Sequence, residues 1–134
     1  MADIDVKFIS VALLYAVLGV GLGIGTGIAE SFAYAHVHAH INLLGFATMV
    51  VYGLIHRAWP VLRQSKLAVV HFWLAMIGTP IFLIGLPFAM FKGQPIGAIL
   101  GSMIVLAGMI VFAVLFIRNA SKASVPGAAA AARA

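Results

Sequence analysis

The chain of 134 residues contains no cysteine. Disulfides, thiolate metal sites and covalent c-type haem attachment are therefore excluded, and any metal would need histidine, methionine, carboxylate or backbone ligands. Charge is also scarce, at 8% of residues with only three acids, whereas soluble domains carry about a quarter charged residues. With 64% hydrophobic residues and a mean hydropathy of +1.17, the composition indicates an integral membrane protein.

Four apolar runs cover residues 8–29, 35–56, 67–91 and 96–117. Each is long enough to cross the bilayer, because about 20 helical residues span the hydrocarbon. The first run is too long for the apolar part of a signal peptide and its start, MADID, is acidic. We predict one all-α transmembrane domain of four helices over residues 1–118 and a low-complexity cytoplasmic tail over residues 119–134.

The basic residues divide unequally between the two sides of such a domain. Lys92 lies alone on one side, and seven lie on the other: Lys7, Arg57, Arg63, Lys66, Arg118, Lys122 and Arg133. By the positive-inside rule, both termini are expected in the cytoplasm of a bacterial-type inner membrane. The same pattern explains the net charge of +5 without a nucleic-acid partner.

The second run opens with three alternating histidines, in the stretch AYAHVHAHINLLGF over residues 33–46. At 100° per residue, His36 and His40 share one face of a helix and His38 points to the opposite side. Ionisable groups inside a membrane are candidate functional residues, and imidazole binds zinc, copper and iron, including haem iron. We predict that His36, His38 and His40 are metal or haem ligands at two separate sites.

A polar stripe continues from His38 along the same face. Its members, at offsets of 4, 7, 11, 14 and 18, are Asn42, Gly45, Met49, Tyr52 and His56. Lipid cannot satisfy such a stripe, so it is expected to face protein, cofactor or water. Asn42 and Gly45 therefore join the predicted cofactor-binding residues, whereas His56 with Arg57 is interpreted as a loop anchor at the inner interface.

Haem is favoured over a bare metal ion by the surroundings of the histidines. A haem is a large, flat, mostly apolar plate that needs a slot with small and aromatic residues, and Gly45 and Phe46 follow the histidines. A bare copper or zinc site would more usually recruit carboxylate or further histidine, and the only acid near the cluster is Glu30. The expected cofactor is a b-type haem (heme b), with copper as the alternative.

Glycines and prolines predict the packing of two helices. Gly19, Gly23 and Gly27 form overlapping small-xxx-small repeats, with Gly21 and Gly25 near a second face, which favours close helix contacts within or between chains. Prolines at 80 and 87 predict a bend in the third helix.

Two segments resemble subunit I of the haem-copper oxidases and nitric oxide reductases. HAHINLLGFATMVVYGLIHRAWP, residues 38–60, is similar to that family's tenth helix, where an H-x-H pair precedes a glycine and a proline. HINLL also resembles the reductases' second helix. VVHFWLAMIGTPIFLIGLPF, residues 69–88, resembles the eleventh helix with its H-F-W, I-G and proline.

In that family the first histidine of the pair binds the high-spin haem and the second binds the low-spin haem. The resemblance thus implies haem ligation by His38 and His40 and a structural role for His71. It covers about 50 residues, and no counterpart of the family's copper-binding histidines on the sixth and seventh helices is present.

The family fold arranges twelve helices as three four-helix arcs, so the resemblance implies that this chain is one arc. Three copies would rebuild the ring as a homotrimer, and closed cyclic symmetry is a common solution for one chain. Each haem would then lie between adjacent protomers, with His40 on one side and His38 or His36 of a neighbour on the other.

The expected function is electron transfer, or binding or reduction of a diatomic gas such as O2 or NO, with a redox partner protein or quinol as electron source. Whether the protein is an enzyme stays open. Two alternatives remain at this point. The HxHxH cluster could bind or transport copper or another metal ion, with Met49 and Met76 as soft ligands for Cu(I), or the chain could be a structural or assembly subunit of a respiratory oxidase.

Overall fold

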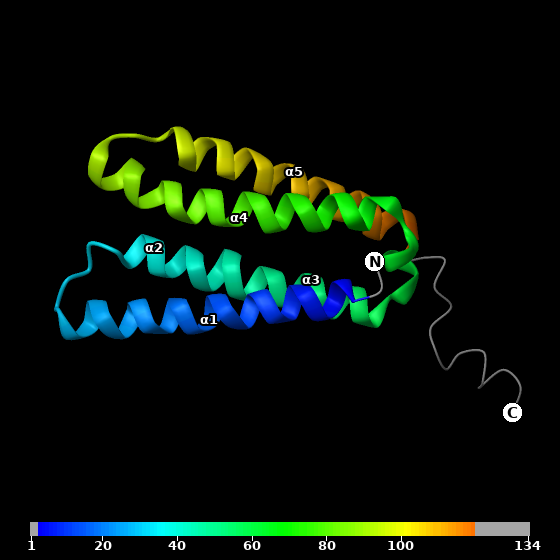
Figure 1. Ribbon diagram of the computed structural model, residues 1–134, viewed down its shortest axis with the longest axis horizontal. Helices are drawn as coiled ribbons and strands as arrows, with labels where there is room; N and C mark the ends of the chain where they lie inside the picture. The colour runs from blue at the N-terminus through cyan, green and yellow to red at the C-terminus, as the bar shows by residue number, and fades with distance from the viewer. Residues whose placement is uncertain (1–2, 120–134) are drawn as a thin grey trace, which may run out of the picture.

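The computed structural model describes residues 3–119 and is helical throughout its membrane-length segments (Figure 1). In chain order the elements are α1 (Ile4–Ile28), α2 (Ala35–His40), the π-helix η1 (Ile41–Thr48), α3 (Met49–Ala58), the 3-10 helix η2 (Pro60–Gln64), α4 (Lys66–Lys92) and α5 (Ile96–Asn119). α2, η1 and α3 follow one another without a break. The predicted tail lies outside the described residues, apart from Asn119.

Four stretches are long and apolar enough to cross a membrane: Ile4–Ile28, Ala35–Ala58, Lys66–Lys92 and Ile96–Asn119. They coincide with the four predicted helices within a few residues at each end, and they are those of a multi-pass membrane protein. Neither Pro80 nor Pro87 ends α4, while the bend predicted there stays a prediction.

An acidic side chain explains why α1 begins four residues before the predicted start. The Asp5 carboxylate is buried and lies 3.4 Å from Arg57 Nε and 3.2 Å from Arg63 Nη1. Arg57 lies in the last turn of the second transmembrane stretch and Arg63 lies in η2. Their charges offset the cost of burying the Asp5 carboxylate in the first turn of α1. The ion pairs tie the start of α1 to the region around η2.

The helices pair as two hairpins, α1 with α2–η1–α3 and α4 with α5 (Figure 1). Glycines bring α4 and α5 into backbone contact. A Cβ added at Gly85 would overlap the backbone nitrogen of Ala98, and one added at Gly101 would overlap the backbone nitrogen of Phe82. Such close approach is the usual way in which membrane helices gain packing energy.

The hydrophobic core lies between the hairpins, toward the end of the bundle where α1 begins and η2 connects α3 to α4 (Figure 1). All four transmembrane stretches contribute to it: Ile4, Phe8, Ala12, Met49, Tyr52, Leu62, Ala68, Phe72, Ala75 and Leu115 are buried. The three alternating histidines lie toward the opposite end, on α2, where fewer apolar side chains are buried.

Candidate functional site

The three histidines of α2 face three different environments. His36 is exposed, whereas His38 and His40 are half-buried. His38 is turned toward α1, and His40 toward the second hairpin. The predicted separation of His38 from His40 is therefore present in the structure.

His38 and Asn42 pack into the glycine face of α1. The His38 Nδ1–H group donates to the Gly19 carbonyl at 2.8 Å, and the Asn42 amide donates to the His38 carbonyl at 2.9 Å. A Cβ at Gly23 would lie 2.6 Å from His38 Cε1, and one at Gly19 would lie 2.6 Å from the Asn42 amide. The close packing predicted at Gly19 and Gly23 is confirmed within one chain.

The remaining glycines of α1 have no such neighbours. A Cβ added at Gly21, Gly25 or Gly27 would meet nothing within 4 Å among the described residues. This part of the small-residue pattern lies on the surface of the chain.

The ring of His40 is held in one orientation by its own helix. Its Nδ1–H group donates to the His36 carbonyl at 2.7 Å, and its ring meets the Phe82 ring edge-on with centroids 5.3 Å apart. A carbonyl can only accept, so the proton is on Nδ1 and the lone pair is on Nε2. Histidines that bind metals typically have this second hydrogen bond.

His40 lines an apolar groove between the two hairpins. The groove has a volume of about 250 Å³ and is lined by His40, Leu44, Phe82, Ser102, Val105, Leu106 and Met109. The Ser102 hydroxyl is already engaged, since it donates to the Ile99 carbonyl at 2.8 Å. Ligand pockets typically enclose about 300–1,000 Å³, so the groove in one chain is too small to enclose a large cofactor by itself.

The π-helix η1 begins directly after His40. Two of the predicted cofactor residues, Asn42 and Gly45, lie within it, and a Cβ at Gly45 would lie 2.6 Å from the Tyr15 ring. The two residues thus contact α1. Single π-turns inside α-helices occur frequently at functional sites, and the sequence pattern, read as a regular α-helix, did not predict one.

The rest of the polar stripe is buried in protein, as predicted. Met49, Tyr52 and His56 are all buried after the π-helix. The Tyr52 ring lies against Phe8 of α1 and Phe112 of α5, with centroids 5.6 and 4.6 Å away. The C-terminal part of the stripe, from Met49 to His56, therefore faces the core between the hairpins.

The interpretation of His56 as a loop anchor is wrong. His56 has no exposed surface, and its ring stacks on Phe8 at a centroid distance of 5.8 Å. His71, predicted to be structural, is equally buried and lies 5.9 Å from His56. Sequence reasoning missed this pair, although the position of His56 on the stripe was a signal that it points inward.

A bare three-ligand metal site is not formed within one chain. Over residues 3–119, no group of three or more histidine, cysteine, aspartate or glutamate side chains lies close enough to hold an ion. The HxHxH spacing therefore does not gather its histidines around a single metal.

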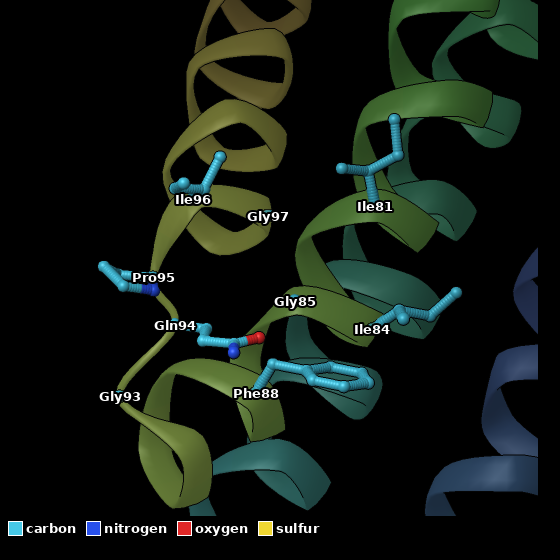
Figure 2. Close-up of a pocket in the computed structure, with 9 residues that line it drawn as sticks. All are labelled: Ile81, Ile84, Gly85, Phe88, Gly93, Gln94, Pro95, Ile96 and Gly97. Carbon is cyan, nitrogen blue, oxygen red and sulfur yellow. The ribbon is translucent and has the colours of Figure 1, made fainter.

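A second groove lies at the turn between α4 and α5, and no histidine lines it (Figure 2). It has a volume of about 650 Å³ and is lined mainly by apolar side chains and glycines, with Gln94 as its one polar side chain. Ile81, Ile84 and Phe88 line it from α4 and Ile96 lines it from α5 (Figure 2). It offers no titratable or metal-binding group and so is not the candidate site.

No family model, curated protein or solved structure matches the chain. The functional argument therefore depends on the residues and geometry described above.

Proposed function

We propose that the protein is a membrane b-type haem protein related to subunit I of the haem-copper oxidases, acting in electron transfer or in binding or reducing a diatomic gas. The observation that carries this proposal is the state of His40. Its Nδ1–H group donates to the His36 carbonyl, and its Nε2 has no hydrogen-bond partner among residues 3–119. The His40 side chain also lines an apolar groove. This is the ligand state that haem iron requires of an axial histidine.

The composition of the groove favours haem over a bare ion. Its walls are almost entirely apolar and include the Phe82 ring, with no carboxylate to neutralise a divalent ion. A haem presents a broad apolar surface that such walls can cover. When bound, haem would supply an iron centre for one-electron chemistry, and His40 would hold and orient that centre.

A second axial histidine would have to come from another chain. All five histidines lie within the described residues. His36 and His40 are adjacent on one helix face, so they cannot ligate opposite faces of one plate. His38 is engaged with α1, and His56 and His71 are buried in the core. The exposed His36 is the histidine that a neighbouring chain could reach.

This argument supports the homotrimer. Three chains would assemble twelve helices, and the open positions at Gly21, Gly25 and Gly27 provide a surface for close contact between subunits. Axial pairing between His40 of one chain and His36 of the next would favour electron transfer, whereas His40 alone would leave a position for a gas.

The optical spectrum of the purified protein tests the cofactor. We expect a b-type haem spectrum after reduction with dithionite, from protein purified in detergent and loaded with haem. A shift on adding CO would indicate an open position, and its absence would indicate two axial histidines. A protein that still shows no Soret band after loading contradicts the proposal.

The mass of the detergent-solubilised particle tests the assembly. Native mass spectrometry should give a particle whose protein mass is three times the chain mass of 14.1 kDa, built from one kind of subunit. A monomer that binds haem fully would contradict the shared site while leaving the cofactor assignment intact.

A further inference from the structure

Two further histidines meet in the core, at the contact between the two hairpins. His56 comes from α3 and His71 from α4, and their ring centroids are 5.9 Å apart. Both side chains are fully buried. None of their four ring nitrogens has a hydrogen-bond partner within residues 3–119.

The surroundings offer these nitrogens nothing to bind. Phe8 and Phe112 each pack against both imidazoles, with ring centroids between 4.7 and 5.9 Å away. The Tyr52 ring meets His71 edge-on at 4.4 Å. Buried imidazoles are normally hydrogen-bonded, because an unpaired polar group in an apolar core is costly. Two such rings side by side point to a missing common ligand.

The spacing fits one transition-metal ion between the rings. A metal–imidazole bond is about 2.0–2.1 Å, so two imidazoles that ligate one ion have ring centroids about 5 to 6 Å apart. The observed 5.9 Å lies in this range. At 5.9 Å between centroids, the N–metal–N angle would be bent, at roughly 140°.

The chemistry of the pocket selects the ion. Zinc usually takes four protein ligands, and no third histidine or acid joins this pair among residues 3–119. The nearest acid on α1, Asp5, is already paired with Arg57 and Arg63. A monovalent ion that accepts two neutral nitrogen ligands is needed, and aromatic faces favour a cation beside them. Copper(I) meets these conditions.

We propose that His56 and His71 form a buried two-coordinate Cu(I) site that links the two hairpins. The site is independent of the haem proposal, because it uses neither the histidines nor the groove of α2. It also differs from copper binding by the HxHxH cluster, which lies toward the other end of the bundle.

The decisive experiment uses a variant in which His36, His38 and His40 are all replaced by glutamine. His56 and His71 are then the only histidines left in the chain. The full-length protein is titrated anaerobically with Cu(I) buffered by bicinchoninate. We expect it to retain one equivalent per chain, and X-ray absorption should show two imidazoles per copper.

A second substitution tests whether the bound copper depends on the buried histidine pair. His71→Phe keeps an aromatic ring in the core and removes one ligand, so it should lose one equivalent of Cu(I) in both the wild-type and the triple-glutamine background. The haem content of His71→Phe should stay at the wild-type level.

Two results would overturn the site. The first is wild-type protein and His71→Phe retaining equal copper, which would leave the pair as packing residues. The second is copper that disappears with the three α2 histidines, which would assign it to the HxHxH cluster. The comparison with His71→Phe is made in the wild-type background, so it holds even if the triple-glutamine variant does not fold.

Discussion

Replacing His40 by alanine should leave the protein almost free of haem. The substitution removes the imidazole that lines the apolar groove, and no other described histidine lines that groove. The loss of an axial ligand should lower the ratio of Soret absorbance to protein by about tenfold or more. The ratio is measured on protein loaded with haem and passed through size exclusion.

His36→Gln is the matched comparison on the same helix. The backbone carbonyl that orients His40 is retained, so His40 keeps its tautomer. If His36 of a neighbour is the second axial ligand, haem should remain bound but become high-spin and bind CO. Wild-type haem content in His40→Ala would remove the basis of the proposed site, because nothing else on α2 offers the same geometry.

Replacing Gly101 by alanine should severely destabilise the second hairpin. The added Cβ would overlap the backbone nitrogen of Phe82, and backbone cannot rotate away as a side chain can. Overpacking typically costs about 1–3 kcal/mol, and we expect a loss near or above about 3 kcal/mol here because α4 and α5 would have to separate. Gly85→Ala should behave alike, since its Cβ would overlap the Ala98 nitrogen. Thermal unfolding in detergent, followed by circular dichroism, measures the effect.

Gly25→Ala provides the control for this prediction. Its Cβ would meet no described atom within 4 Å, and alanine has the higher helix propensity, so the unfolding temperature should stay the same or rise. A smaller particle mass for Gly25→Ala at unchanged stability would place this glycine at the subunit contact. Wild-type melting of both Gly85→Ala and Gly101→Ala would show that α4 and α5 do not pack at these glycines.

The number and limits of the helices followed from hydropathy, because a membrane span needs a long apolar run and leaves a clear record of it in the sequence. The start of α1 was less accessible. Asp5 reads as a polar flank until its partners Arg57 and Arg63, more than 50 residues away, are known to lie beside it. Long-range ion pairs leave no local pattern.

The candidate site was predictable in part for a similar reason. The opposed directions of His38 and His40 follow from helix geometry over two residues, which any helical form nearly preserves. The π-helix after His40 was not predictable. Its residues are almost uniformly apolar, so the sequence has no polar–apolar periodicity that would reveal a change in the number of residues per turn. The burial of His56 beside His71 depends on how the two hairpins pack against each other, and the sequence of a single helix does not predict that packing.

The position of Asp5 also constrains the order in which the protein can be assembled during synthesis. Its partner Arg57 lies at the end of the second transmembrane stretch and its partner Arg63 follows that stretch, so both are translated more than 50 residues after Asp5. The carboxylate in the first turn of α1 thus lacks these two ion pairs until the ribosome has passed Arg57 and Arg63. Phe8, one turn further along α1, stacks on His71 of the third transmembrane stretch. The N-terminal half of α1 can therefore complete its packing only after that stretch has also entered the membrane. Of the four helices, the first to be translated is in this sense among the last to complete its packing.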